Sequence, residues 1–443
     1  MNLIKSLRLD RATSETPIIS FVGAGGKTSA IFKLAREMRS DSYHSVLVSA
    51  TTHLGSWQTS LADHHVIAKD IDDLDNLPEN GIILITGEIE NERTNPIDKT
   101  ILAWLHEYTI ARNIPFLIEA DGARQKPLKA PALHEPPIPE FTQIVIVVAG
   151  LQAIGKPLTE EYIHRDASFS LLSGIRTNQP ITADALVRVL SDPLGGFKNI
   201  PIHARSVAFL NQADTPELQS IGGSMARELI DEYNSVIVGS LENNQYQTFE
   251  RCAGIILAAG ESTRFGSAKQ LLEWKGKPFV RQVAETALHS GLQPVTVITG
   301  FQASAVESAL DGLQVKIVHN PDFRQGQSTS IRAGLQKIEL NIGAAIFLLA
   351  DQPQIPEDII HALVDSHSKN LQPILAPLVH EERRANPVLF DRVAFPDLLN
   401  LTGDVGGRAI FDKHPVDYLP WHDDILLFDV DRPEDYERLK GME

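Results

Sequence analysis

Short apolar stretches rich in β-branched residues recur along the whole chain of 443 residues. Between them lie longer segments in which apolar residues recur at helical spacing. This alternation predicts an α/β fold in which parallel strands are joined by crossover helices, and the continuous apolar runs are typical of strands covered on both faces. The predicted strands lie at 18–22, 45–50, 81–86, 115–120, 143–149, 206–210 and 235–239, and then at 254–259, 294–299, 315–319, 344–350, 374–378 and 425–430.

A polar run at 241–251 (LENNQYQTFER) interrupts this pattern, which then starts again. We therefore expect a linker there, an N-terminal domain over 1–245 and a C-terminal domain over 252–443, and the length of the chain also suggests more than one domain. Ligands of parallel sheets bind outside the carboxyl ends of the strands. The residues that directly follow the predicted strands are therefore the first candidates for function.

The charge balance and the cysteine content narrow the functional classes. The chain has 40 Lys and Arg against 57 Asp and Glu, a formal charge of −17, so we expect no nucleic-acid partner. The single cysteine, Cys252, excludes a disulfide framework and a multi-cysteine metal site. We find no apolar stretch of about 18 residues and no secretion-type leader, so we expect no membrane span and a cytoplasmic location.

A glycine-rich loop, GAGGKTS, follows the first predicted strand and precedes a helical pattern. Backbone N–H groups in such a loop and at the start of a helix bind phosphate, the lysine would neutralise phosphate oxygens, and the threonine hydroxyl would ligand Mg²⁺. The predicted site for ATP or GTP consists of Gly23, Gly25, Gly26, Lys27, Thr28 and Ser29. The spacing is shorter than that of the common G-x-x-x-x-G-K-[ST] loop, and an ordinary glycine turn remains the alternative.

Polar residues follow three other strands of the first half. In the stretch LIEADGAR, an apolar strand ends in Glu119 and Asp121, one of which would hold Mg²⁺ or take up a proton; two solvated loop acids are the alternative. Thr51, Thr52 and His53 follow the strand at 45–50 and are candidates near the phosphates or structural loop residues. The stretch FLNQAD (209–214) faintly resembles the N-K-x-D guanine-binding segment of GTPases, but a polar loop after a strand is the favoured interpretation.

Residues 18 to about 239 resemble the selenium-dependent hydroxylase accessory proteins of the YqeC type. The resemblance lies in five blocks that occur in order: SFVGAGGKTS, ATTHLG, LIEADGARQKPLKAPALHEPPIP, AGLQAIGKPLTEEYIHR and FLNQAD. It implies a P-loop nucleotide-binding protein linked to the maturation of selenium-containing molybdenum hydroxylases, with the apo-hydroxylase as a possible partner. It implies no particular reaction.

The second half opens with GIILAAGESTRFGSAKQLLEWKGKP (254–278), a strand followed by a glycine loop with two cations, Arg264 and Lys269. An enzyme that transfers a nucleotidyl group must hold a triphosphate and stabilise charge on the α-phosphate. Asp351 after one later strand, and Asp429 with Asp431 after another, are the predicted Mg²⁺ ligands. We therefore predict Arg264, Lys269 and Asp351 as catalytic residues; surface charges and a helix N-cap are the alternative.

Residues 252–443 resemble the molybdenum cofactor cytidylyltransferases of the MocA type, within the MobA-like nucleotidyltransferase superfamily. The matching stretches are LAAGESTRFGSAKQLL, NPDFRQGQSTSIRAGL, LLADQPQI, RANPVLF, LTGDVGGRAI and FDVDRPEDYERL. The resemblance implies a Rossmann-like domain with a mostly parallel sheet that uses Mg²⁺ to transfer CMP from CTP to Mo-molybdopterin. LAAG, where related guanylyltransferases have LAGG, favours a pyrimidine base.

The predicted nucleotide-binding residues of this second site are Leu257, Ala258, Ala259, Gly260, Gly266, Ser328 and Ser330. Asn320 is a further candidate for the base or ribose, and Asp404 with Arg408 for the acceptor. Two alternative functions remain open: a transferase that uses another NTP or phosphate acceptor, and a non-catalytic chaperone that binds the cofactor for an apo-hydroxylase.

Overall fold

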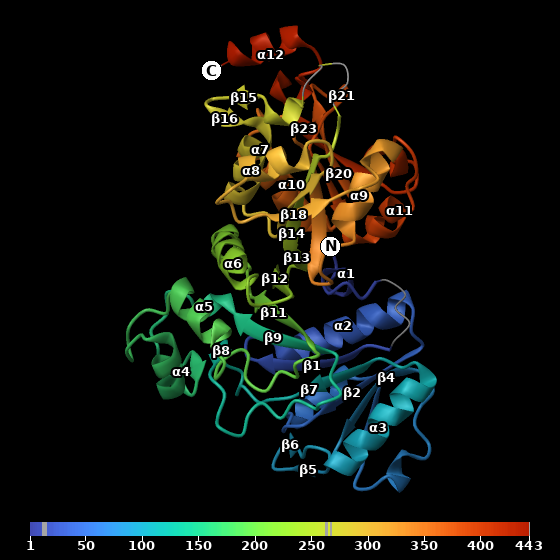
Figure 1. Ribbon diagram of the computed structural model, residues 1–443. Coiled ribbons are helices and arrows are strands. Elements are labelled where there is room, and N and C mark those ends of the chain that lie inside the picture. Colours follow the sequence, from blue (N-terminus) through green and yellow to red (C-terminus); the bar gives the residue numbers. More distant parts are fainter. Residues whose placement is uncertain (11–15, 262–264, 266–267, 443) are drawn as a thin grey trace. The chain divides into compact units, whose positions relative to one another are not determined.

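The computed structural model describes residues 1–10, 16–261, 265 and 268–442. The chain divides into two compact units, Met1–Phe249 and Glu250–Glu443, each built around its own sheet (Figure 1). The mixed α/β class and the dominance of parallel strands, both predicted from the sequence, are confirmed. No helix in the described ranges has the length and apolar character needed to cross a membrane.

The N-terminal unit contains a nine-stranded sheet in the order β13-β12-β11-β9-β1-β7-β2-β4-β3. All neighbouring strands are parallel except β13, which runs antiparallel to β12. The strands are β1 (Ile18–Gly23), β2 (Ser45–Ala50), β3 (His64–Ile67), β4 (Gly81–Thr86), β7 (Phe116–Glu119), β9 (Ile144–Gly150), β11 (Arg205–Asn211), β12 (Ser235–Ser240) and β13 (Gln245–Phe249). Two short ladders pair β5 (Ile89–Glu90) with β6 (Arg93–Thr94) and β8 (Leu128–Lys129) with β10 (Ile163–His164).

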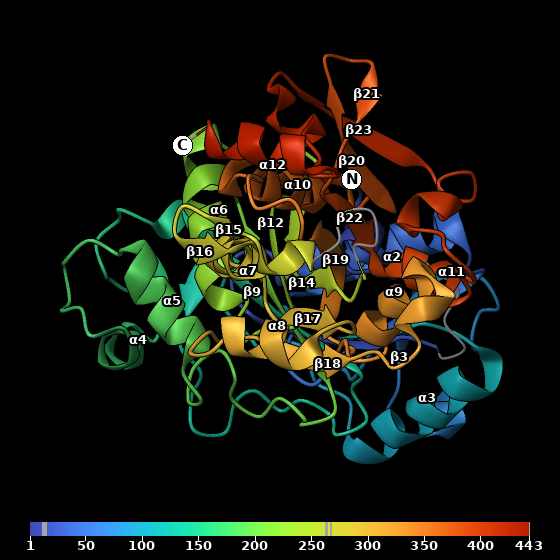
Figure 2. The ribbon, with the colours of Figure 1, turned by 45° about the horizontal axis from the view of Figure 1, so that its top comes forward.

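Helices cover both faces of this sheet. In β1, Ile19 and Phe21 pack toward α2, whereas Ile18 packs toward α3, which explains why the strand is apolar throughout. Helix α4 lies beside α5 (Figure 2). One face carries α1 (Leu3–Ser6) and α2 (Lys27–Asp41); the other carries α3 (Lys99–Arg112), α5 (Ala183–Ser191) and α6 (Pro216–Leu229), with α4 (Asp166–Ser173) outside them. The 3₁₀ helices are η1 (Ser56–Leu61), η2 (Asp72–Leu74) and η3 (Leu151–Ala153).

The sheet of the C-terminal unit has the order β18-β17-β14-β19-β22-β20-β21, and β23 pairs with β20. Strands β18, β17, β14 and β19 are parallel, whereas β22 runs antiparallel to both of its neighbours. The strands are β14 (Arg251–Ala258), β17 (Val295–Thr299), β18 (Lys316–His319), β19 (Ile342–Leu349), β20 (Ile374–Val379), β21 (Arg383–Arg384), β22 (Val388–Asp391) and β23 (Val416–Trp421), with a separate ladder of β15 (Glu273–Trp274) and β16 (Lys277–Pro278).

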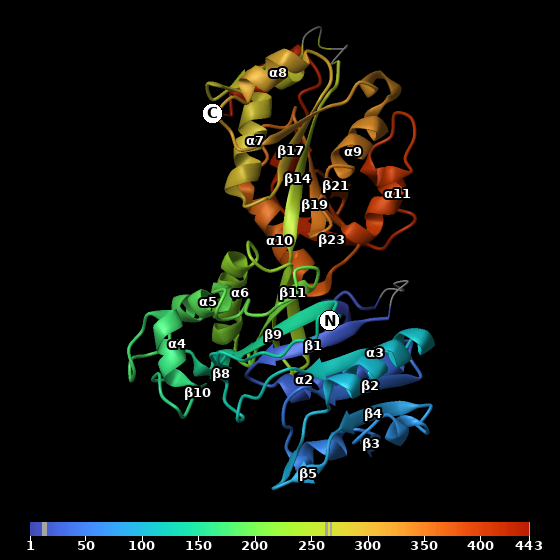
Figure 3. The ribbon, with the colours of Figure 1, turned by 60° about the horizontal axis from the view of Figure 1, so that its bottom comes forward.

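Helices α7, α8 and α10 cover one face of this second sheet, and α9 and α11 cover the other (Figure 3). Helix α12 closes a small separate core in which Leu439 packs with Trp274, Phe279 and Val430. The helices are α7 (Phe279–His289), α8 (Ala303–Ala309), α9 (Gln327–Leu335), α10 (Glu357–Asn370), α11 (Phe395–Leu399) and α12 (Pro433–Lys440), and the 3₁₀ helices are η4 (Lys269–Leu271), η5 (Phe323–Gln325), η6 (Arg392–Ala394), η7 (Gly407–Ile410) and η8 (Asp424–Leu427).

The prediction of a strand at 425–430 is wrong. Residues 424–427 form η8, whose first turn is capped by Asp423, and Leu426 is buried in the core beneath the sheet. The apolar run therefore reflects a turn that covers the core. Residues 245–249, expected in a linker, form the antiparallel edge strand β13 instead, with Tyr246 and Phe249 buried.

Candidate functional site

The loop after β1, which we call the first glycine loop (residues 23–29), requires glycine at several positions. Gly23, Gly25 and Gly26 have φ angles of +91°, +86° and +113°. A Cβ atom on Gly25 would lie 2.4 Å from the backbone nitrogen of Gly150. Helix α2 begins at Lys27 with no side-chain cap, and the N–H groups of a first helical turn have no partners inside the helix. The strand, turn and helix start thus form the local arrangement that binds anions in proteins.

Lys27 and Thr28 contact two acidic residues at the carboxyl end of β7, Glu119 as its last residue and Asp121 just after it. The buried Lys27 Nζ donates to the carbonyl of Gly23 (2.7 Å) and lies 3.1 Å from Asp121 Oδ1 and 3.9 Å from Glu119 Oε1. The Thr28 hydroxyl donates to Glu119 Oε2 (2.7 Å). Burial raises the pKa of Glu119, although Lys27 and Thr28 oppose the rise. The structure therefore brings together four of the residues predicted from two separate motifs.

Asp121 belongs to a chain of ion pairs that sequence reasoning missed. Its Oδ2 accepts from the backbone N–H of Gly23 (3.0 Å) and lies 2.8 Å from Lys129 Nζ, which is 2.9 Å from Glu135 Oε2. Arg165 binds Glu135 through two nitrogens, at 2.6 and 2.9 Å. Burial alone would raise the pKa of Glu135, but the hydrogen bonds from Arg165 and Lys129 lower it to about 2. Only the local run of cations in DGARQKPLKAP hinted at this network.

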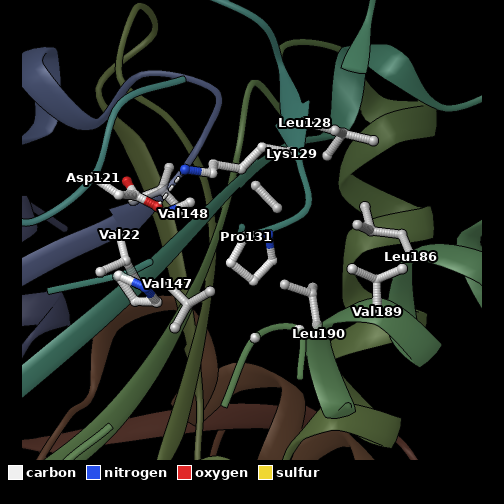
Figure 4. A pocket seen from close by; sticks show the side chains of 15 residues that line it. Val22, Asp121, Leu128, Lys129, Pro131, Val147, Val148, Leu186, Val189 and Leu190 are labelled. Carbon is white, nitrogen blue, oxygen red and sulfur yellow. Dashed lines mark hydrogen bonds and ion pairs between the residues drawn. The ribbon is translucent and has the colours of Figure 1, made fainter. Parts of the chain in front are cut away.

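Two cavities adjoin this network. The smaller has a volume of about 40 Å³ and lies between Asp121, Lys129 and the apolar side chains of α5 (Figure 4). The larger has a volume of about 1050 Å³ and opens at the carboxyl ends of β1, β2, β7 and β11. The predicted residues that line the larger cavity are Gly25, Gly26, Lys27, Thr28, Ser29, Thr52, His53 and Glu119.

Cationic side chains, among them Arg124, Lys126 and Arg165, also line the larger cavity. Burial and the neighbouring cations Arg165, Lys129 and Arg124 lower the pKa of His164 to about 4, so this ring is neutral at pH 7. His53 Nδ1 lies 2.9 Å from the carbonyl oxygen of Thr94, which fixes the ring in its loop. The cavity is thus locally basic in a strongly acidic protein, as a site for a phosphate-bearing ligand would be.

The C-terminal unit has a cavity of about 550 Å³ at the carboxyl ends of β14 and β19. The predicted residues in its lining are Leu257, Ala258, Ala259, Gly260, Lys269, Ser330, Asp351 and Asp404. Gln270, which we did not predict, also lines it and donates to the carbonyls of Ala258 (3.4 Å) and Gly260 (3.3 Å). Two other predicted residues, Arg264 and Gly266, lie outside the described residues.

Lys269 joins the carboxylates of this second site. Its Nζ lies 2.8 Å from Asp431 Oδ1 and 3.9 Å from Asp351 Oδ2, and its side chain is buried. Burial raises the pKa of Asp351; Lys269 opposes the rise, and Asp429 and Asp431 add to it. Asp429 Oδ1 accepts a hydrogen bond of 2.5 Å from Gln352 Nε2. Across the described ranges, no group of three His, Cys, Asp or Glu side chains is close enough to hold a metal ion.

The other predicted residues of the second half form a frame around α9. Asn320 Nδ2 donates to the hydroxyls of Thr329 (2.8 Å) and Ser330 (3.0 Å). Ser328 is fully buried, and its hydroxyl donates to the carbonyl of Gly403 (2.7 Å). Asp404 Oδ1 accepts from the N–H of Gln327 (3.1 Å). Ser330 lines the cavity. Ser328 instead holds the 403–404 loop against α9 through its hydrogen bond to Gly403. Arg408 lies 3.4 Å from Asn386 Oδ1.

Comparisons with known proteins identify both halves. Residues 19–167 match the YqeC protein family, and residues 254–418 match the MobA-like NTP transferase domain. The chain therefore belongs to the YqeC family in its N-terminal part and to the MobA-like NTP transferases in its C-terminal part. The expected fusion of these two families is confirmed, and the C-terminal unit is a nucleotidyltransferase related to molybdenum cofactor cytidylyltransferases.

Three relatives illustrate the two matches. The uncharacterized protein YqeC of Escherichia coli K12 is 32% identical over 218 residues, which are 47% of this chain and 80% of the relative. The nicotine blue oxidoreductase of Paenarthrobacter nicotinovorans is 30% identical and covers 42% of this chain and 95% of the relative. The molybdenum cofactor cytidylyltransferase of Escherichia coli K12 is 23% identical and covers 41% and 92%. Among solved structures, Rv0371c of Mycobacterium tuberculosis H37Rv is 28% identical, with a TM-score of 0.39 and coverage of 44% and 98%.

Proposed function

We propose that the C-terminal unit transfers CMP from CTP to Mo-molybdopterin and produces molybdopterin cytosine dinucleotide and pyrophosphate. The observation that carries this proposal is that Lys269, Asp351 and the backbone after β14 line a single cavity of about 550 Å³. The relative named molybdenum cofactor cytidylyltransferase supports the choice of reaction, and Ala259 in the LAAG stretch supports a pyrimidine nucleotide.

The proposed chemistry is an in-line displacement at phosphorus. A terminal phosphate oxygen of Mo-molybdopterin forms a bond to the α-phosphorus of CTP, and the bond to the oxygen that bridges the α- and β-phosphates breaks. Because the attacking phosphate is already ionised at neutral pH, no general base is required, and catalysis consists of positioning and charge stabilisation. Lys269 supplies a fixed positive charge beside the cavity, and Arg264 is proposed to add a second.

Asp351 is proposed to hold a Mg²⁺ ion together with the substrate phosphates, because Asp351, Asp429 and Asp431 do not form a group of three described carboxylates close enough to hold the ion alone. Carboxylate oxygens are the ligands that Mg²⁺ prefers, and it is often bound by one or two carboxylates together with substrate phosphates. Burial raises the pKa of Asp351, and a bound Mg²⁺ ion would oppose that rise by favouring the ionised form. When bound, Mg²⁺ would offset the charge that develops on the phosphate oxygens.

For the N-terminal unit we propose nucleotide triphosphate binding at the first glycine loop. Lys27 would contact the phosphates, and Thr28 with Glu119 would ligand a Mg²⁺ ion. The hydrogen bond between the Thr28 hydroxyl and Glu119 supports this assignment, because it places two oxygen ligands side by side at the start of α2. We further propose that this unit, over residues 1–245, assists the maturation of selenium-dependent molybdenum hydroxylases, while 252–443 carries the transferase.

Pyrophosphate release tests the proposed transferase. The full-length chain would be mixed with Mo-molybdopterin, Mg²⁺ and CTP, and pyrophosphate and the dinucleotide would be quantified together. We expect one pyrophosphate for each dinucleotide formed. A chaperone that only binds the finished cofactor would release none, and pyrophosphate release without the cytosine dinucleotide would mean that CMP passes to water, which would contradict Mo-molybdopterin as the acceptor.

A further inference from the structure

The loop after β11 is fastened directly to the first glycine loop. Asn211 is buried, and its Nδ2 donates to the carbonyl of Gly25 (2.7 Å). Its Oδ1 accepts from the backbone N–H of Leu241 (3.2 Å), which follows β12. A Cβ atom on Gly26 would lie 2.6 Å from Asn211 Nδ2. One amide side chain thus fixes the ends of β11 and β12 against the glycine loop.

Asp214 is held in this fastened loop with one carboxylate oxygen still available. The backbone N–H of Ala213 donates to the carbonyl of Gly239 (3.0 Å). Asp214 Oδ1 accepts from the Ser240 hydroxyl (2.5 Å), and that hydroxyl accepts in turn from the N–H of Asn243 (2.9 Å). The side chain is exposed, and within the described part of the chain its Oδ2 has no hydrogen-bonding partner.

The same loop borders the larger cavity of the N-terminal unit. Gln212, between Asn211 and Asp214, lines the cavity together with Gly25, Gly26 and Lys27. Strands β1, β9, β11 and β12 are neighbours and parallel, so their carboxyl ends lie along one edge of the sheet. The first glycine loop and the loop of Asp214 therefore lie along the same edge of the sheet, where a nucleotide with its phosphates on the glycine loop would bind.

We propose that Asp214 recognises a guanine base, so that the N-terminal unit is a GTP site. The inference rests on the proposed nucleotide binding at the first glycine loop and adds the identity of the base. Guanine presents two adjacent donors on one edge, N1–H and the C2 amino group, and an ionised carboxylate is an acceptor only. Adenine presents the N1 lone pair at the corresponding position, which an acceptor repels. A site whose polar groups are built for one hydrogen-bonding pattern strongly rejects the analogue that lacks it.

Equilibrium binding to the full-length chain tests the inference. Labelled, non-hydrolysable analogues of GTP, ATP and XTP would be titrated with Mg²⁺ into the wild type, Asp214→Asn and Lys27→Ala. Binding that the Lys27→Ala change abolishes belongs to the glycine loop rather than to the C-terminal cavity. We expect this component to favour the guanine analogue over the adenine analogue by roughly 100-fold.

The Asp214→Asn variant provides the sharpest outcome. Xanthine carries a carbonyl at C2, where guanine carries an amino group, so an asparagine amide can donate to xanthine but no longer accepts both guanine donors. We expect guanine affinity to fall and xanthine affinity to rise, a gain that an unfolded protein cannot produce. Asp184→Asn, at an exposed carboxylate on α5, should leave all three affinities unchanged.

The possible failures are distinguishable. Equal affinity of the Lys27-dependent site for the guanine and adenine analogues, or unchanged guanine binding in Asp214→Asn, would overturn the guanine inference and leave nucleotide binding standing. The absence of Lys27-dependent binding by any of the three analogues, in a variant set shown by circular dichroism to be folded, would contradict the proposed nucleotide site and the inference together.

Discussion

Two buried lysines, Lys27 and Lys269, occupy corresponding positions in the two units. Each lies near the carboxyl end of a central strand, and each contacts carboxylates, Asp121 and Glu119 in one unit and Asp431 with Asp351 in the other. A buried ammonium group would be costly without such partners. The carboxylates therefore fix each lysine beside a cavity. There the lysine provides the local positive charge that a polyphosphate needs in a protein of negative net charge.

Motif spacing identified these lysines and Asp351, but not the network of Lys129, Glu135 and Arg165. A glycine loop after a strand constrains its neighbours, so the chemistry of Lys27 can be inferred locally. The pairing of Glu135 with Arg165 joins residues 30 positions apart and depends on how the intervening chain folds. Nothing in their spacing distinguishes this pair from surface charges.

Replacement of Asp351 by asparagine tests the charge arrangement of the second site. The change keeps the size of the side chain but removes the negative charge, so the proposed Mg²⁺ site is lost while Asp431 still binds Lys269. We expect kcat for dinucleotide formation to fall by roughly 10²–10³-fold, in the range of a lost electrostatic contact in a transition state. Asp311→Asn, at an exposed position, is the control. Turnover by Asp351→Asn at the wild-type rate would contradict a role of Asp351 in catalysis and in the proposed Mg²⁺ site.

Glu135 predicts a measurable dependence of stability on pH. The pKa of Glu135 in the folded protein is about 2, below the usual value of 4.5. The ionised carboxylate therefore stabilises the fold fully above pH 4.5, and this stabilisation is lost as the pH falls toward 2. The full contribution corresponds to roughly 3 kcal/mol. Hydrogen exchange of peptides from the N-terminal unit should show a smaller acid destabilisation in Glu135→Gln than in the wild type. The exposed Glu140→Gln is the control, and equal acid profiles for Glu135→Gln and the wild type would contradict the network.

At the scale of elements, several strands that are buried on both faces were predicted from their continuous apolar runs, but the equally buried β22 was not. Strands β1, β2 and β4 are among those predicted. The edge strand β13 was missed, because it mixes polar and apolar residues and follows a turn. The segment 425–430 was mistaken for a strand because a 3₁₀ turn that covers a core is as apolar as a short strand. Sequence periodicity cannot separate these two cases.

The turn between β1 and α2 predicts unequal effects of two glycine substitutions. Gly25 and Gly155 both have positive φ angles, +86° and +80°, but a Cβ on Gly25 meets Gly150 whereas a Cβ on Gly155 meets nothing within 4 Å. Gly155→Ala should lower the free energy of unfolding by about 1 kcal/mol, because only the strain of alanine at a positive φ angle is added. Gly25→Ala should lower it by about 3 kcal/mol or more. Denaturant unfolding followed in the N-terminal unit measures both. Equal costs would show that the first glycine loop adjusts freely.

At the scale of the whole molecule, two units with different sheets each contain a cavity of the same kind. Each has a cavity at the carboxyl ends of its parallel strands, lined by glycine-loop backbone and a paired lysine. The formal charge of −17 disfavours anions at long range, so selectivity must come from these local groups. Fusion of the two families in one chain thus places two proposed nucleotide sites in a single protein.

The identity of the dinucleotide formed in a mixture of nucleotides tests the central proposal most directly. The full-length protein would receive Mo-molybdopterin, Mg²⁺ and equal concentrations of CTP, GTP and ATP, and the products would be identified by mass spectrometry, with Asp351→Asn as the inactive control. We expect molybdopterin cytosine dinucleotide as the main product, together with an equal amount of pyrophosphate. A guanine or adenine dinucleotide as the main product, or no dinucleotide at all, would contradict the proposal.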